Sequence, residues 1–189
     1  MARILGTVSS SVQKISGAFE SIASVTLGSN TTSMSFSSIP QTYKALQLRI
    51  MARHSAPVLQ GAIYLQVNGN SNSAIYTRHG LEGDGTSVSA GGAATGSYNF
   101  GPYFYVPGAN ATSNIFGVFI IDIHDYDSTS KNKTIRVFHG EDRNGAGSVS
   151  LVSSLVVSTS AITSFVFTAD AGNSLVTGST AALYGIKGE

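Results

Sequence analysis

With 189 residues the chain fits one domain of ordinary size, and the absence of cysteine excludes disulfides, thiolate zinc sites and cysteine nucleophiles. Only 11% of the residues are charged, and 11 basic against 10 acidic residues give a formal net charge of +1. This balance argues against nucleic-acid binding, which needs a concentrated basic face.

Alternating apolar and polar residues predict a series of short strands in the first third of the chain. We predict strands at Phe19–Leu27, Met34–Phe36, Tyr43–Arg53 and Ile63–Val67. The last of these ends at Asn68-Gly69, a dipeptide typical of β-hairpin turns.

The rest of the chain continues this pattern and contains no convincing helix, because Ser, Thr and Gly interrupt every stretch of helical spacing. Ile115–Ile123 is nearly all apolar, so we expect a central strand that is covered on both faces. About ten strands joined by turns predict an all-β fold, an antiparallel β-sandwich, over residues 19–189. The further predicted strands are Ala74–Arg78, Tyr98–Val106, Ile115–His124, Lys133–His139, Ser148–Ser158, Ala161–Thr168 and Thr180–Lys187.

Two segments depart from the strand pattern. Residues 1–18 have loose helical spacing of apolar side chains, weakened by three serines and Gly6, and we interpret them as an N-terminal docking arm. Glu82–Ser97 is a Gly-, Ser- and Ala-rich stretch, and we expect a surface loop, or a loop that a neighbouring subunit orders. Its Gly83-Asp84-Gly85 is expected to form a turn. The apolar residues of the arm are Ile4, Leu5, Val8, Val12 and Ile15.

The histidines and the acidic residues are the first candidates for chemistry. Each histidine stands alone in the sequence, without a second one at metal-ligand spacing, so we expect His54, His79, His124 and His139 at the surface or in turns. A serine hydrolase is not indicated, since the chain has no G-x-S-x-G motif.

Asp122 to Asp127 is the most chemical-looking stretch. On a strand Asp122, His124 and Tyr126 would share one face, while Asp125 and Asp127 follow at its end. Carboxylates grouped in this way can hold Ca²⁺, but the spacing is not that of an EF-hand, and polar residues at a strand exit commonly form the turn. An enzyme would require the acids to converge in one cleft, namely Asp122, Asp125, Asp127, Glu141 and Asp142.

Aromatic residues cluster after the Gly-rich stretch, from Tyr98 to Tyr105. Phe100 and Phe104 are expected to fill the core. Tyr103 and Tyr105, with Asp84 from the preceding stretch, are candidate contacts to another subunit or to a glycan, because exposed tyrosines pack well against both.

The low charge predicts self-association. A weakly charged surface provides little repulsion, and few lysines are available to protect sheet edges. Assembly into a homo-oligomer, which we expect to be a trimer, or into a larger particle would cover the weakly charged surface and protect the sheet edges. The longest apolar run, Ile115–Ile121, is too short to cross a membrane as a helix, and the N-terminus does not resemble a signal peptide, so we expect folding in the cytoplasm.

Five segments stand out together by their order and spacing: FESIASVTLG at 19–28, FSSIPQTYKALQLR at 36–49, VNGN at 67–70, LEGDGT at 81–86 and ALYGIKG at 182–188. In this order they resemble a family of small tailed-bacteriophage virion proteins. The resemblance spans about residues 17–188 and implies a jelly-roll type of β-sandwich and a role as a virion structural, minor tail or fibre protein. It implies no catalytic residues and no cofactor.

The functional expectation is therefore a non-enzymatic phage structural protein, made in the host cytoplasm and displayed on the virion. Residues 1–18 would dock on other virion proteins, and the sandwich would face outward for host attachment, with the tail favoured over the head. One alternative is a decoration protein on the phage capsid. Another is a lectin-like module that binds a host-surface glycan through Tyr103, Tyr105 and the Glu82–Ser97 stretch.

Overall fold

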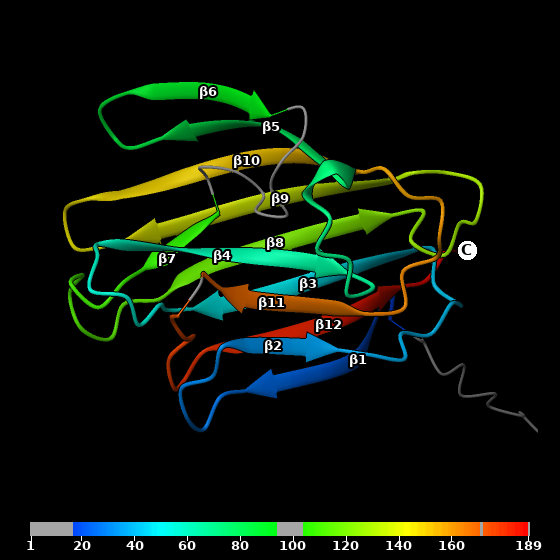
Figure 1. Cartoon of the computed structure of the whole chain (residues 1–189), viewed down its shortest axis with the longest axis horizontal. Helices are drawn as coiled ribbons and strands as arrows, with labels where there is room; N and C mark the ends of the chain where they lie inside the picture. The colour runs from blue at the N-terminus through cyan, green and yellow to red at the C-terminus, as the bar shows by residue number, and fades with distance from the viewer. Residues whose placement is uncertain (1–16, 94–103, 171, 189) are drawn as a thin grey trace, which may run out of the picture.

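Two antiparallel sheets packed face to face form the molecule (Figure 1). The computed structural model describes residues 17–93, 104–170 and 172–188. An eight-stranded sheet has the order β1-β12-β3-β8-β9-β10-β5-β6, and a four-stranded sheet has the order β2-β11-β4-β7. The predicted all-β antiparallel sandwich is thus confirmed. The strands are β1 Phe19–Thr26, β2 Ser33–Phe36, β3 Ala45–Ala52, β4 Gln60–Val67, β5 Tyr76–Gly83, β6 Val88–Ala93, β7 Tyr105–Pro107, β8 Gly117–His124, β9 Lys133–Asp142, β10 Gly147–Val156, β11 Phe165–Ala169 and β12 Thr180–Ile186.

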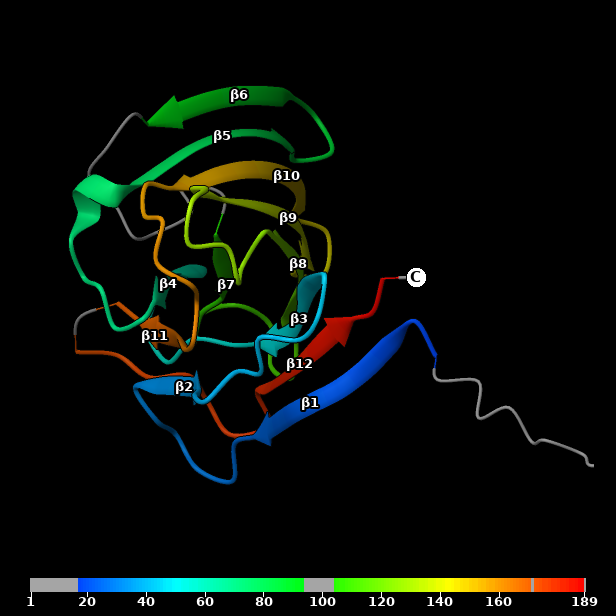
Figure 2. The ribbon, with the colours of Figure 1, turned by 90° about the vertical axis from the view of Figure 1, so that its right-hand side faces the viewer.

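Eight of the strands pair in a nested order. β1 pairs with β12, β2 with β11, β3 with β8 and β4 with β7, all antiparallel. Two hairpins, β5–β6 and β9–β10, extend only the larger sheet, beyond β8. Figure 2 shows the result from the side, with the four-stranded sheet against one face of the larger one. On the opposite face of the eight-stranded sheet, which we call the outward face, the described residues place no second sheet.

The core lies between the sheets and follows from strict alternation along the strands. Leu48 on β3, Ile121 on β8 and Val137 on β9 point inward and have no exposed surface. Leu65 on β4 and Phe167 on β11 meet them from the smaller sheet and are equally buried. Burying one such side chain stabilises the fold by roughly 1.5–3 kcal/mol, so the sandwich rests on these alternate residues.

Tyr126 packs into the core at one end of the sandwich, although the sequence pattern predicted that it would share a face with Asp122. The chain turns at Asp125, whose φ is 53°, and this brings Tyr126 into the core instead of onto the face of Asp122. The Tyr126 hydroxyl donates to the Pro40 carbonyl at 2.6 Å and accepts from the Tyr43 backbone N–H at 3.2 Å. Burial raises the pKa of this phenol, so it stays protonated and keeps both hydrogen bonds.

Two expected connections differ from the prediction. β6, at Val88–Ala93, lies inside the stretch predicted as a loop and pairs with β5 through its backbone. Its Ser, Ala and Gly residues give no hydrophobic alternation, which is why the pattern missed it. Asn68 and Gly69 do form a turn, with φ of 53° and 64°, but β4 and β5 belong to different sheets, so the turn closes no hairpin between them.

The surface position expected for the histidines is wrong for two of the four. His54 and His139 are buried, at 0% and 1% exposure, whereas His79 and His124 are exposed. His54 Nδ1 accepts from the Ala56 backbone N–H at 3.0 Å, and its Nε2 lies 3.1 Å from Asp170 Oδ1. His54 lies outside the named strands, whereas His139 shares the inward face of β9 with Ile135 and Val137, as the alternation of this strand indicates.

Candidate functional site

The residues singled out from the sequence fall into different parts of the fold. The apolar residues of the predicted arm, in residues 1–16, and Tyr103 lie outside the described residues. Tyr105 is half-buried on β7, opposite Ala62 of β4. Asp84 is exposed in the β5–β6 turn, where the expected Gly-Asp-Gly turn is confirmed.

Asp84 serves its own turn. Its Oδ1 accepts from the backbone N–H groups of Thr86 and Ser87 at 2.8 and 2.7 Å, and its Oδ2 accepts from the Ser87 hydroxyl at 3.0 Å. These hydrogen bonds hold the pKa of this carboxyl well below its ordinary value. The side chain therefore stabilises the β5–β6 hairpin in its ionised form.

The acids that an enzyme would need do not converge. Asp122 lies on the outward face of β8 and accepts from Gln47 Nε2 at 2.8 Å, whereas Glu141 of β9 points inward. Asp125 and Asp127 follow the end of β8 that pairs with the start of β9, far along that strand from Glu141 and Asp142. Within the described ranges no group of three or more His, Asp or Glu side chains is placed to hold a metal ion.

A histidine and a serine that the sequence did not connect are brought together in the interior. His139 Nδ1 lies 3.3 Å from the Ser150 hydroxyl, and its ring stacks on Phe119 with centroids 4.3 Å apart. Burial lowers the pKa of His139 to about 4, so the ring is neutral at pH 7. Both residues are at most 2% exposed, so this pair is shielded from a substrate and forms part of the packing.

Glu141, on the same side of β9, is also engaged internally. Its Oε1 accepts from Gln60 Nε2 at 2.8 Å and is paired with Arg143. The hydrogen bond between Glu141 and Gln60 joins β9 to β4 of the smaller sheet, since Gln60 begins β4. The buried carboxylate is therefore balanced by a charge and a hydrogen bond, which is what a buried acid requires.

The most unusual surface of the protein is the outward face of the eight-stranded sheet. Strand β8 was expected to be covered on both sides, but Val118 and Ile120 are 51% and 39% exposed. The same holds for alternate residues of the strands around it. Of the large hydrophobic residues that are exposed in the described chain, eight lie on the adjoining strands β3, β8, β9, β10, β5 and β6, Phe19 lies on the same face at the edge strand β1, and three lie elsewhere (Val58, Leu59 and Val157). We call the eight the apolar patch, and they are Met51, Leu81, Val88, Val118, Ile120, Phe138, Val149 and Leu151.

Strand register brings the patch together across β3, β8, β9, β10, β5 and β6. Ile120, Phe138, Leu151 and Leu81 are direct cross-strand neighbours, while glycines separate Val118, Val149 and Val88 in the adjacent row. Three rows cross these six strands, and neighbouring side chains within a row lie about 5 Å apart. The first row is Arg49, Ile120, Phe138, Leu151, Leu81 and Ala90; the second is Met51, Val118, Gly140, Val149, Gly83 and Val88; the third is Gln47, Asp122, Arg136, Ser153, His79 and Gly92. The first two rows are mostly apolar, and the third is polar.

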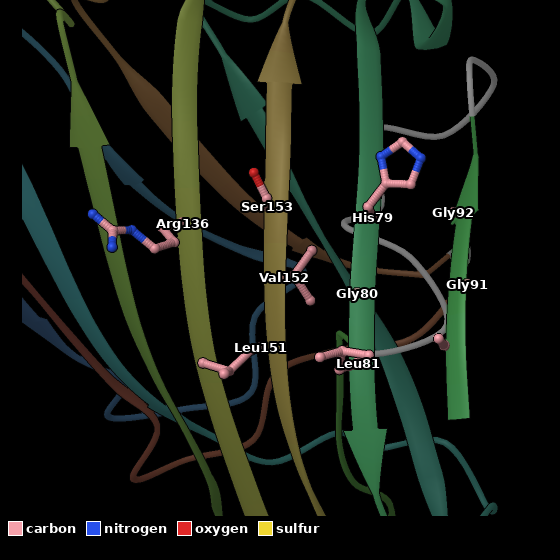
Figure 3. A pocket seen from close by; sticks show the side chains of 10 residues that line it. His79, Gly80, Leu81, Gly91, Gly92, Arg136, Leu151, Val152 and Ser153 are labelled. Carbon is pink, nitrogen blue, oxygen red and sulfur yellow. The ribbon is translucent and has the colours of Figure 1, made fainter. Parts of the chain in front are cut away.

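A hollow of about 660 Å³ opens in this face, over β9, β10, β5 and β6 (Figure 3). It exists because β6 carries only small residues there, namely Ala90, Gly91 and Gly92. The His79 ring occupies the space beside Gly92, where an added Cβ would lie 2.6 Å from the ring. Leu81 and Leu151 form an apolar floor, so the hollow is suited to an apolar protein side chain.

Charge on the outward face is sparse and balanced. On the outward face the described strands of this sheet carry two arginines, Arg49 and Arg136, and two aspartates, Asp122 and Asp142. These strands place no lysine on that face. The Arg49 guanidinium lies 5.8 and 5.3 Å from the centroids of the Phe19 and Tyr184 rings, which anchors it beside the patch. The arrangement of an apolar centre with a polar border is that of a protein–protein interface.

Comparison with known proteins found no matching family model, no similar curated protein and no similar solved structure. The described part of the chain contains one helical element, the 3₁₀ turn Ser73–Ile75, and nothing in it is a helix able to cross a membrane. The class of protein that the fold and the outward face define is a β-sandwich with an exposed apolar surface on its larger sheet.

Proposed function

We propose that the protein is a structural protein of a bacteriophage particle, displayed on the virion and held there through contacts between proteins. The resemblance of residues 17–188 to small virion proteins of tailed phages supports this proposal. The observation that carries it is the apolar patch, because a contiguous apolar surface beyond a few hundred Å² is rare on a free monomer and common at protein contacts.

The jelly-roll type of the sandwich remains a prediction, and the nested pairing supports it. A jelly roll arises when one long antiparallel ribbon of strands is rolled up, which pairs the first strand with the last and so on inward. The pairs β1–β12, β2–β11, β3–β8 and β4–β7 follow that scheme. The two additional hairpins, β5–β6 and β9–β10, would then be insertions.

Localisation on purified particles tests the role on the virion. Antibody raised against the sandwich, followed by immunogold electron microscopy, is expected to label intact particles at the tail. Label spread over the head would instead support the alternative, a capsid decoration protein. Particles that contain no trace of the chain by mass spectrometry would contradict both versions.

The predicted docking arm has its own test. Deletion of residues 2–18 is expected to abolish incorporation into particles while the sandwich still folds, because the first strand begins at Phe19. Circular dichroism and thermal unfolding of the purified variant check the fold. A truncated chain that joins particles as well as the full chain would show that the arm has no docking role.

A further inference from the structure

We infer that the apolar patch is the contact surface between two copies of this chain, related by a two-fold axis that runs parallel to the strands between β9 and β10. This inference deepens the proposed function by naming a partner, a second copy of the chain. Only the location of the pair on a virion rests on the proposed function. It departs from the trimer expected from the sequence, because a two-fold pair needs one self-complementary surface, and the patch has that property.

The area of the sheet face that carries the patch suits this role. Six strands spaced by about 4.8 Å span about 29 Å, and eight residues at about 3.3 Å extend about 26 Å. The outward face of the six neighbouring strands β3, β8, β9, β10, β5 and β6 therefore has an area of roughly 750 Å². This is close to the roughly 800 Å² that each partner contributes to a stable interface. A second sheet of the same twist fits on it as the two sheets of a sandwich fit on each other.

The second row of the patch complements itself in shape. An axis between β9 and β10 places Val149 of one copy opposite Gly140 of the other, and Val118 opposite Gly83. Each valine then meets a residue without a side chain. Met51 meets Val88 at the ends of the row, so all the exposed side chains of the row find a counterpart.

The first row brings apolar side chains together at the centre. Phe138 lies opposite Leu151, and Ile120 lies opposite Leu81 on the floor of the hollow. These four residues are between 39% and 54% exposed in the single chain. Burying them removes from water four of the eight apolar side chains of the patch.

The charges allow this pairing. The third row places Asp122 opposite His79, and Arg136 opposite Ser153, so no two like charges meet across the axis. With two arginines and two aspartates on the face, two copies bring together no net charge. Arg49 meets Ala90 at the border and keeps its place over Phe19 and Tyr184.

Sedimentation of the purified full-length protein tests the pairing without particles, so its result is independent of whether the protein is found on a virion. The wild type is expected to have twice the mass of one 19.6 kDa chain at micromolar concentration. Leu151→Glu is expected to be a single chain with unchanged circular dichroism, because it places a charge against Phe138. Leu59→Glu, at a residue that is 60% exposed against 54% for Leu151 but precedes β4, serves as the matched control and stays paired.

Crosslinking then tests the axis, and the chain is suited to it because it has no cysteine of its own. Leu151→Cys treated with a short bis-maleimide is expected to yield crosslinked pairs, since this residue lies beside the axis in both copies. Leu59→Cys is expected to remain single. A single-chain wild type, a wild type of three chains, a Leu151→Glu variant that still pairs, or equal crosslinking of the two cysteine variants would each overturn the two-fold pair.

Discussion

The two faces of the eight-stranded sheet use the same strands but have different partners. On β8 the inward residues Phe119, Ile121 and Ile123 are at most 2% exposed, beneath the four-stranded sheet and its loops. The outward Val118 and Ile120 are just as apolar, yet they are 51% and 39% exposed. Both faces of β8 are therefore apolar, but within the described residues only the inward face is covered.

This contrast shows what continuous hydrophobicity in a strand means. A strand with apolar residues at every position is usually buried on both sides by one chain. Here the same pattern marks a strand that is covered by its own chain on one side and is suited to a contact with another protein on the other. The pattern indicates how many faces need a cover, but not which molecule provides it.

The largest expected effect separates the two faces directly. Phe119→Ala removes a ring that lies 4.3 Å from both the Phe104 and the His139 rings, and we expect it to lower the free energy of unfolding by about 3–5 kcal/mol. Val118→Ala, its outward neighbour, is expected to cost less than about 1 kcal/mol in a single chain such as the Leu151→Glu variant. Urea unfolding measures both, and equal losses would contradict the difference between the faces.

The inward face also predicts a dependence on pH. The pKa of His139 is about 4 in the fold, below the ordinary value of 6.5, so the unfolded chain binds this proton first. The contribution of the neutral ring is complete above pH 6.5 and is lost as the pH falls towards 4, by about 3 kcal/mol in total. Urea unfolding of His139→Gln between pH 7 and 4 is expected to show a flatter profile than the wild type. Equal slopes for the variant and the wild type would contradict this contribution of the His139 ring.

A smaller effect is expected at the closed end of the sandwich. Tyr126→Phe removes the hydroxyl that joins Pro40 to Tyr43 and leaves a buried carbonyl and N–H without this partner. We expect a loss of about 1–3 kcal/mol in the free energy of unfolding. Thermal unfolding at neutral pH measures it, and an unchanged midpoint would show that water replaces the hydroxyl.

The smallest effect is expected at the β5–β6 turn, on the border of the patch. Asp84→Ala removes the acceptor for the N–H groups of Thr86 and Ser87. The exchange of these two amides with deuterium should become faster, while amides of β8 and β9 keep their protection. Unchanged exchange at Thr86 and Ser87 would show that the backbone alone fixes this turn.

The sequence predicted the all-β class and most strands, because alternation depends directly on which residues face the core. It missed β6, whose Ala and Gly residues pair through the backbone alone, and it misplaced Tyr126, because a residue with positive φ at Asp125 reversed the direction of the chain. The patch was visible only in part. Val118 and Ile120 stood out as apolar, but the pairing of Ile120 with Phe138 depends on a strand register that no single strand specifies.

The position of β12 has a consequence for how the chain folds during its synthesis. Leu183 pairs with both Ala23 and Leu48, so β12 fills the slot between β1 and β3. While the ribosome is still synthesising the chain, the edges of β1 and β3 that face β12 lack their partner strand until Ile186 has emerged. Closure of the sheet is thus a late event that joins distant parts of the chain, which makes folding slow and leaves the nascent protein dependent on protection from aggregation.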